Sequence, residues 1–215
     1  MAPKFVDKER KIKEIAQAAL TLFSQKGYAA TSVSQIAKAA GIGKGTIYEY
    51  FRTKADIFVA ALREWTARFE KRLAKHLEEI ENPIERLNAI AEMNIELVDP
   101  LDPATAQLSL EFLQQSLLED GILYKRRYLL KEMHTGQSRM VTDILLDGIS
   151  KGFFRPEIAR DVETIAINLL AYFDGVRLHS IVSENYFDLK KQAYFYLNNL
   201  IGSIQTAGSQ IKNLN

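Results

Sequence analysis

The sequence of 215 residues contains no cysteine, which excludes disulfide bonds and thiolate metal sites. This absence favours a reducing compartment, and we expect a cytoplasmic protein. A membrane span needs roughly 18 or more consecutive apolar residues. The longest candidate, residues 165–173, is half that length and contains Asn168. The first residues are charged and carry no apolar stretch, which argues against a secretory signal. We therefore expect no membrane partner.

The usual signatures of catalysis are also missing. The three histidines, at positions 76, 134 and 179, are scattered, and no His-Glu-x-x-His motif occurs. Residues 41–46 contain glycines and a lysine, but they lack the spacing of a phosphate-binding loop and a preceding strand. Acidic residues are dispersed along the expected helix surfaces. We expect a protein that is not an enzyme and that uses no metal and no cofactor.

Helical periodicity dominates the sequence. Ile12, Ile15, Ala19 and Phe23 fall on one face of a helix that ends at Gly27. No run of alternating β-branched residues is long enough for a strand. Further helices are expected at residues 33–40, 44–51, 54–81, 83–98, 104–118, 122–151, 158–184 and 188–205. The expected fold class is therefore all-α, with about nine helices.

Charge is distributed unevenly along the chain. The net charge is only +1, yet residues 1–58 carry ten Lys and Arg against five Asp and Glu. The remaining residues carry 18 basic against 22 acidic side chains. A basic head on a mildly acidic body is typical of a nucleic-acid-binding segment, although chance clustering of solvated side chains produces the same counts.

Residues 33–51 have the layout of a helix-turn-helix motif. Two short helices are joined by a tight turn containing Gly41, and Ser32 with Gln35 forms a capping-box pattern before the first helix. In such a motif the second helix lies in the major groove, with its N-terminal residues towards the bases. We expect a homeodomain-like, three-helix DNA-binding domain at the N-terminus.

The second short helix opens with residues that suit contact with DNA. Gly43 and Gly45 let the backbone approach closely, and Lys44 can reach a guanine edge or a phosphate. The Thr46 hydroxyl can bond a base edge, and the tyrosine hydroxyls that follow suit phosphates. The expected DNA contacts are Thr31, Ser32, Gly43, Lys44, Gly45, Thr46, Tyr48, Tyr50 and Lys54.

Each of these residues has a structural interpretation as well. Tyr48 and Tyr50 are compatible with aromatics at the edge of a core, Lys44 with a solvated helix cap, and Lys54 with a surface position. The two hydroxyl residues before the first short helix can cap it and do no more. The combination favours DNA binding. Glu49 fits least, because phosphate repels a carboxylate; it points away from the backbone or accepts from a cytosine amino group.

The run TSVSQIAKAAGIGKGTIYEYFRTKADI, residues 31–57, resembles the DNA-binding signature of TetR/AcrR-type transcriptional regulators. The preceding LFSQKGYAAT, residues 22–31, resembles the same family, so the similarity covers most of residues 10–58. It implies a DNA-binding domain over residues 1–53 and a ligand-binding and dimerisation domain over residues 54–215. The sequence departs from the pattern at Gly43, often Ser or Thr in the family, and at Tyr50, often His.

The expected helices at 158–184 and 188–205 are apolar on more than one face. A helix that is apolar all round is buried on all sides, which a single chain rarely achieves for its last helix, so we expect a partner surface. Core packing is the alternative. The resemblance implies a homodimer with a four-helix interface, and its recognition helices would lie about one DNA turn apart. The candidate interface residues are Leu169, Phe173, Val176, Tyr194, Leu197 and Ile201.

The resemblance also implies a ligand pocket enclosed by the middle helices. Aromatic and methionine side chains suit an apolar pocket, and polar residues in apolar stretches need a partner that a ligand can supply. Core packing and hydrogen bonds between helices are the alternatives. The candidate pocket residues are Trp65, Phe69, Met93, Phe112, Tyr128, His134, Asn168 and Tyr172. Because no dense charged cluster is present, we expect a neutral or weakly polar effector.

Together these features predict a sequence-specific transcriptional regulator, a repressor released from a double-stranded DNA operator by a small, largely apolar ligand. The helix at 54–81, which joins head and body, is the expected lever. One alternative is an architectural or division-type DNA-binding protein with the same head and no effector. Another is a helical interaction module whose head does not bind DNA. The basic and hydroxyl side chains of the head argue against it: Lys44, Thr46, Tyr48 and Lys54.

Overall fold

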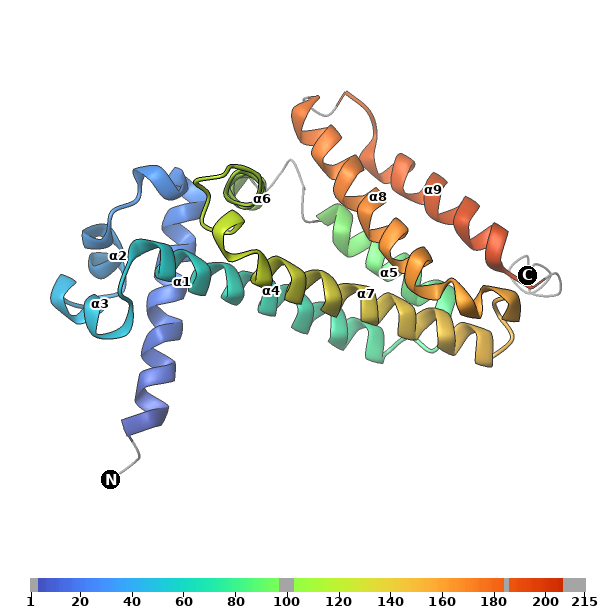
Figure 1. The fold of residues 1–215 in the computed structure, drawn as a ribbon, viewed down its shortest axis with the longest axis horizontal. Helices are drawn as coiled ribbons and strands as arrows, with labels where there is room; N and C mark the ends of the chain where they lie inside the picture. Colours follow the sequence, from blue (N-terminus) through green and yellow to red (C-terminus); the bar gives the residue numbers. More distant parts are fainter. Residues whose placement is uncertain (1–3, 97–102, 184–185, 207–215) are drawn as a thin grey trace. The chain divides into compact units, whose positions relative to one another are not determined.

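A computed structural model of the chain describes residues 4–96, 103–183 and 186–206, without the side chains of residues 4–7 and 103–106. Within these ranges the regular elements are nine α-helices and two 3₁₀ helices, which confirms the all-α fold (Figure 1). They are α1 (Lys4–Ala30), α2 (Val33–Ala39), α3 (Lys44–Tyr50), α4 (Lys54–Glu78), α5 (Pro83–Glu96), α6 (Pro103–Leu117), η1 (Tyr124–Arg126), α7 (Arg127–Ser150), η2 (Pro156–Arg160), α8 (Val162–Val182) and α9 (Leu189–Ile204).

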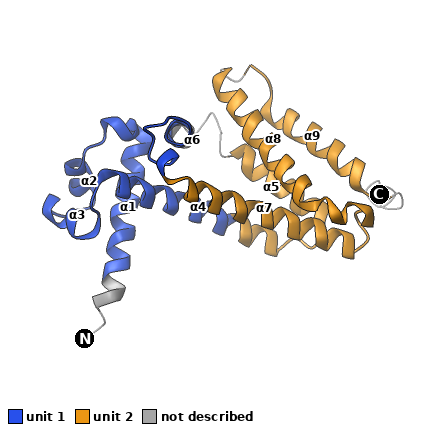
Figure 2. Ribbon diagram, in the orientation of Figure 1, with its two compact units in different colours: residues 1–72, 100–125 blue, residues 73–99, 126–215 orange. Residues whose placement is uncertain are grey.

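The chain groups into two compact units (Figure 2). Unit 1 comprises residues 1–72 and 100–125, and unit 2 comprises residues 73–99 and 126–215. The helix α6 therefore belongs to the same compact unit as α1, α2 and α3, although it is distant from them in sequence. The functional boundary expected at residue 53 stays a prediction.

Unit 1 is organised around α1, which packs against α2, α3 and α6. Its apolar stripe is buried, with Ile15 and Phe23 fully enclosed. The rings of Phe23, Tyr28 and Phe58 lie within 5.3 to 5.8 Å of one another, centroid to centroid, which brings the start of α4 onto the end of α1. The core of unit 1 thus joins α1 to the helices that follow it.

Unit 2 is built from α5, α7, α8 and α9, with α5 packed on α7 and α9, and α8 packed on α7 and α9. Phe154, after α7, is fully buried, and an isolated antiparallel bridge pairs it with Gln205 at the end of α9. Gly148 in α7 makes this possible, because a Cβ atom there would lie 2.2 Å from the Phe154 ring. The end of α9 is therefore fastened to the segment between α7 and α8.

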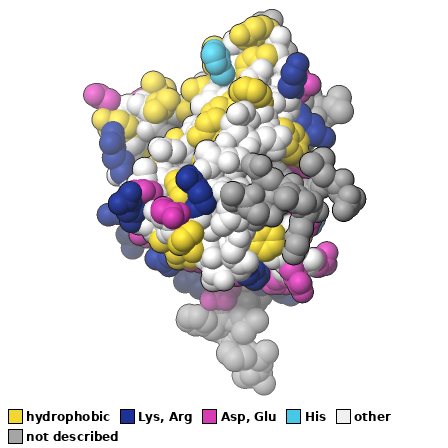
Figure 3. Space-filling model, turned by 90° about the vertical axis from the view of Figure 1, so that its right-hand side faces the viewer, with side chains coloured by type: hydrophobic (Ala, Val, Ile, Leu, Met, Phe, Trp, Pro, Cys, Tyr) yellow, Lys and Arg dark blue, Asp and Glu magenta, His cyan; other side chains and the backbone are white. Residues whose placement is uncertain are grey.

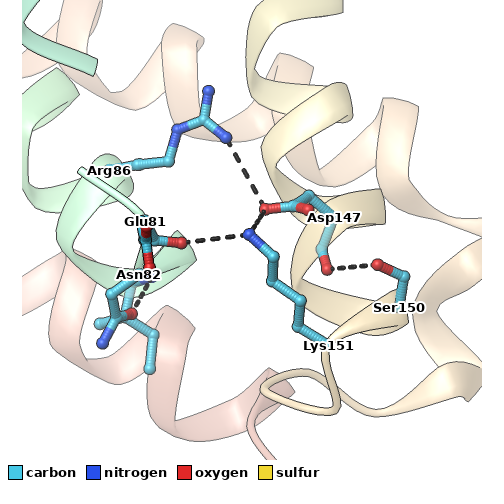
Figure 4. Close-up of polar contacts among 7 residues, drawn as sticks. Glu81, Asn82, Arg86, Asp147, Ser150 and Lys151 are labelled. Carbon is cyan, nitrogen blue, oxygen red and sulfur yellow. Dashed lines mark hydrogen bonds and ion pairs between the residues drawn. The ribbon is translucent and has the colours of Figure 1, made fainter. Parts of the chain in front are cut away.

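A polar junction fixes the turn between α4 and α5 to the end of α7 (Figure 4). The Lys151 ammonium donates to the Asp147 carboxylate at 2.9 Å and to the backbone oxygen of Glu81 at 3.2 Å. Arg86 of α5 lies 3.7 Å from the same carboxylate. These groups are partly exposed, so we assign the junction a structural role and a modest contribution to stability.

Two expected helices are interrupted in the structure. The stretch expected at 122–151 begins as the 3₁₀ helix η1, and Arg126 leaves helical geometry before α7 starts. The stretch expected at 158–184 is split by Asp161, at φ −114° and ψ 2°, into η2 and α8. The other observed helix ends lie close to those expected. The last two residues of the helix expected at 83–98 lie outside the described residues.

The helix α8 is long and apolar enough, by length and composition, to cross a membrane. The same test is passed by core helices of water-soluble proteins, so it is weak evidence for a span. Most of its apolar stretch faces outwards, since only 22% of that stretch is buried within the chain.

Candidate nucleic-acid interface

The start of α2 is held by the capping box that the sequence predicts. The Gln35 backbone N–H donates to the Ser32 hydroxyl oxygen at 3.3 Å, and the Ser32 backbone N–H donates to the Gln35 side chain at 2.8 Å. The helix ends at Ala39 with Ala40 as its C-cap, and Gly41 follows with a φ of +67°, which suits glycine and reverses the chain. Backbone bonds from Gly41 to Lys38 and from Ile42 to Ala37 close this turn. Local chemistry therefore sets the helix-turn-helix geometry.

The short helix α3 is fixed to unit 1 by its apolar side. Ile47 is fully buried and Phe51 nearly so, as their spacing predicts. The cap position is Gly43, in extended conformation, and no side chain caps the helix there. Burial of two side chains, and not capping, therefore holds α3 in place.

The opposite side of α3 is open to solvent. Lys44, Gly45 and Glu49 are exposed, and Tyr48 is 51% exposed, whereas Thr46 and Tyr50 are half-buried. A Cβ atom on Gly45 would meet no atom of the described residues within 4 Å. Packing within the chain therefore does not demand glycine at this position, which is consistent with a need for clearance towards an external partner.

Two expected DNA contacts are used inside the chain instead. Thr31 is only 1% exposed, and its hydroxyl donates to the backbone oxygen of Gly27 at 2.8 Å. The Lys54 ammonium donates to the backbone oxygens of Tyr28 and Thr31 at 2.8 and 2.9 Å. Burial lowers the pKa of Lys54, and the negative charge of Glu111 opposes that shift. Both side chains stabilise the junction between α1 and α2, so we remove them from the candidate interface.

Two exposed basic residues, one inside the motif and one just after it, were not among the expected contacts. Lys38 of α2 and Arg52, after α3, are both exposed. Both belong to the excess of basic residues that the sequence shows in residues 1–58. That excess does not indicate which of the basic side chains are exposed. The candidate interface combines an exposed helix start, exposed basic side chains and a tyrosine, which are the groups that bind phosphates and base edges.

Comparison with known proteins agrees with this geometry. Residues 15–61 match the family described as "Bacterial regulatory proteins, tetR family", and residues 83–200 match "BetI-type transcriptional repressor, C-terminal". The chain belongs to the TetR family. It is therefore a DNA-binding transcriptional regulator and not an enzyme.

Relatives of the TetR family resemble the chain over most of its length. It is 32% identical over 190 residues to the HTH-type transcriptional regulator HbdR of Aromatoleum sp. (strain CIB), covering 85% of this chain and 79% of that one. It is 27% identical over 197 residues to the fatty acid metabolism regulator protein of Bacillus subtilis (strain 168), covering 92% and 97%. The structure of the fatty acid degradation regulator FadR from Bacillus halodurans matches with a TM-score of 0.68 at 25% identity, covering 89% and 95%.

The candidate pocket residues of this TetR-family chain are divided between the two units. Trp65, Phe69 and Phe112 are half-buried side chains of unit 1. In unit 2, Met93 is buried and Tyr172 half-buried, with its ring stacked on Tyr196. The other three candidates are exposed, and so are not enclosed as a pocket lining would be: Tyr128, His134 and Asn168. In the described part of the chain, no group of three or more His, Asp or Glu side chains could hold a metal ion.

Four of the six candidate dimer residues lie inside unit 2. Leu169, Phe173, Leu197 and Ile201 are buried in the chain itself, so they belong to its core and not to a surface offered to a partner. The other two are half-buried, and the Tyr194 hydroxyl donates to Glu92 of α5 at 2.5 Å. The exposed large apolar residues of α8 and α9 are different ones: Ile167, Leu178, Val182 and Phe195. Hydrophobic side chains are visible on the face of the molecule in Figure 3.

Proposed function

We propose that the protein is a repressor that binds a pseudo-palindromic operator as a homodimer and is released by a small, largely apolar ligand. The observation that carries this proposal is the helix α3, pinned by Ile47 and open at Lys44, Gly45 and Tyr48. A helix start of this kind accepts phosphates through unpaired N–H groups and reads bases through its first side chains. Such a regulator acts in the cytoplasm, where bacterial DNA lies.

The homodimer is supported by one face of α8. Ile167, Ala171, Gly175, Leu178 and Val182 are exposed and recur at spacings of four, four, three and four residues, which is one stripe of a helix. Val182 is 71% exposed and Phe195, on the neighbouring α9, is 68% exposed. A self-complementary apolar face is what a two-fold dimer needs, and the small residues allow two copies of α8 to approach closely.

An apolar effector is supported by the names of two relatives. Two similar proteins are named as regulators of fatty acid metabolism or degradation. We therefore propose a molecule with an acyl chain as the first effector class to test. Effector binding lowers operator affinity only as far as the effector prefers the conformation that does not bind DNA.

Selection of DNA fragments by the purified protein, followed by sequencing, tests the proposal directly. We expect an enriched sequence with two related half-sites about one helical turn apart. Palmitate is then added to the operator complex, with acetate as the control that has the same carboxylate and no apolar chain. Release by palmitate and not by acetate supports the effector class, and no release by either excludes free long-chain fatty acids as effectors. Absence of any enriched sequence contradicts the function.

Substitutions in α3 test which side chains bind the selected operator. Lys44→Ala and Tyr48→Ala should each weaken binding, on the order of tenfold. If Lys44 contacts a phosphate, its loss should also reduce the slope of log K against log salt by about one. The control is Thr135→Ala, an exposed change in α7. Unchanged operator affinity in both α3 variants would exclude α3 as the recognition helix.

A further inference from the structure

Glu111 of α6 is a buried carboxylate in unit 1 that recognition of DNA does not explain. It is 6% exposed, and a buried charge is costly unless hydrogen bonds satisfy it. One carboxylate oxygen accepts the backbone N–H of Tyr28 at 2.9 Å, across 83 positions of sequence. The other accepts the Gln115 side chain at 3.0 Å. Gln115 in turn accepts the backbone N–H of Ile122 at 2.9 Å, which holds the carboxylate from behind.

The Tyr28 N–H needs such a partner because α1 is broken just before it. Gly27 has φ 73° and ψ 172°, so the helical pattern of backbone bonds is interrupted there. This φ favours glycine, and a Cβ atom would also lie 3.0 Å from the nearer Glu111 oxygen. Glycine at position 27 therefore creates the break and leaves room for the carboxylate that satisfies it.

The backbone carbonyl of Tyr28 is also hydrogen-bonded, by a side chain of α4. The Lys54 ammonium, at the start of α4, donates to the Tyr28 oxygen at 2.8 Å and lies 4.1 Å from the Tyr28 ring centroid. It also donates to the oxygen of Thr31, the residue before the Ser32 cap of α2. Residues 28–31 are therefore held between a carboxylate of α6 and an ammonium of α4, and they lead directly into α2 and α3.

We propose that Glu111 is a positioning residue for operator binding, which orients the helix-turn-helix by fixing the Tyr28 backbone to α6. The proposal rests on the proposed function, since orientation matters only if α3 reads DNA. Loss of the bond frees the junction between α1 and α2. Operator affinity then falls, while nonspecific affinity persists, because phosphate attraction needs the basic side chains but not one orientation.

Three substitutions separate the hydrogen bond from charge and from general stability. Glu111→Gln keeps an oxygen that accepts the Tyr28 N–H but loses the bond accepted from Gln115. Glu111→Leu keeps the bulk without any acceptor. The matched control is Glu119→Gln, which removes an exposed carboxylate of the same unit. Where the leucine variant does not fold, Glu111→Asp replaces it, because its carboxylate is one methylene too short to reach Tyr28.

The first readout is hydrogen exchange of the Tyr28 amide in the intact protein. We expect exchange on the order of tenfold faster in Glu111→Leu than in the wild type, with a smaller change in Glu111→Gln and none in Glu119→Gln. The second readout is the ratio of operator to nonspecific affinity. We expect this ratio to fall about tenfold in Glu111→Leu and to be largely restored in Glu111→Gln.

Three outcomes would overturn the proposal. They are unchanged Tyr28 exchange in folded Glu111→Leu, equal loss of operator and nonspecific affinity, and a glutamine variant as defective as the leucine variant. The exchange measurement needs no DNA, so it judges the role of Glu111 even if no operator is selected. Failure of the wild type to select DNA would instead contradict the proposed function.

Discussion

The exposed sides of α3 and α8, which no described residue covers, differ in chemistry. The open side of α3 carries a lysine, a glycine, a glutamate and a half-exposed tyrosine. The open side of α8 carries isoleucine, leucine and valine, with alanine and glycine between them. Charged and hydroxyl groups keep their hydration until a charged partner replaces it, whereas exposed apolar stripes favour burial against a similar surface.

This difference indicates two partners of different kinds. The open side of α3 suits a polyanion, because its binding energy comes from phosphate contacts and base-edge hydrogen bonds. The stripe on α8 suits a second copy of the chain, because a two-fold axis presents the same apolar face twice. We therefore expect binding at α3 to weaken when a charged side chain is removed, and association through α8 to weaken when a charge is added.

The largest expected effect comes from adding charge to the α8 stripe. Ile167→Glu combined with Val182→Glu should convert the dimer to a monomer, because carboxylates would be buried at the two-fold interface. Operator affinity should fall on the order of 100-fold, since the two recognition helices lose their linkage. Light scattering after size exclusion and operator titration measure both effects, with Thr135→Glu on α7 as the control. A variant that stays dimeric would exclude this face as the interface.

The next largest effect is on stability, and it comes from comparing two glycines of α7, of which only Gly148 lies against a buried side chain. Gly148→Ala should lower the free energy of unfolding by about 1–3 kcal/mol, because its methyl group would collide with the buried Phe154 ring. Gly136→Ala, in the same helix and with nothing within 4 Å of its Cβ, is the control and should stabilise the protein by about 0.5–1 kcal/mol. Urea unfolding measures both variants, and equal stability would contradict the packing role.

Gly45→Ala in α3 should separate stability from binding. The methyl group enters open space and raises helix propensity, so stability should rise by about 0.5–1 kcal/mol. Operator affinity should nevertheless fall about tenfold, because the methyl group occupies the clearance towards DNA. Thermal unfolding and operator titration on the same sample decide the matter. Full operator affinity in the alanine variant would show that this clearance is not used.

The smallest effect concerns Tyr194 of α9, whose hydroxyl donates a hydrogen bond to the Glu92 carboxylate. Burial and this hydrogen bond to a carboxylate raise the pKa of Tyr194 to about 12 from 10.0. Because the folded state holds the proton more tightly, the resulting stability is complete below pH 10 and is lost as the pH rises towards 12. The stability of the wild type relative to Tyr194→Phe should therefore decline over this window. Parallel urea titrations measure it, and a constant difference would contradict the shift.

Much of the head could be predicted from sequence because its determinants are local. The capping box at Ser32, the turn at Gly41 and the buried Ile47 all follow from spacing along the chain. The roles of Thr31 and Lys54 could not be predicted in this way. Gly27 marks the break in α1, but nothing in the sequence says that the Thr31 hydroxyl and the Lys54 ammonium donate to backbone oxygens beside it.

The candidate dimer residues show the opposite limit. The sequence places apolar residues on nearly all sides of α8. Periodicity does not indicate which of these sides is covered by other helices of the same chain. Packing against α7 and α9 buries Leu169 and Phe173 and leaves Ile167 and Val182 exposed. That these helices form a dimer interface stays a prediction. The candidate residues for that interface are now Ile167, Leu178, Val182 and Phe195, which are exposed.

Helical periodicity, capping and turn residues act over a few neighbouring positions, so the class of this protein could be predicted from its amino-acid sequence. The packing of the helices settles which side chains remain available. It buried Thr31, turned Lys54 inwards and brought Glu111 of α6 to Tyr28 of α1. The physical reason is that burial and long-range hydrogen bonds depend on which helices pack together, and residues far apart in sequence carry no mark of that proximity.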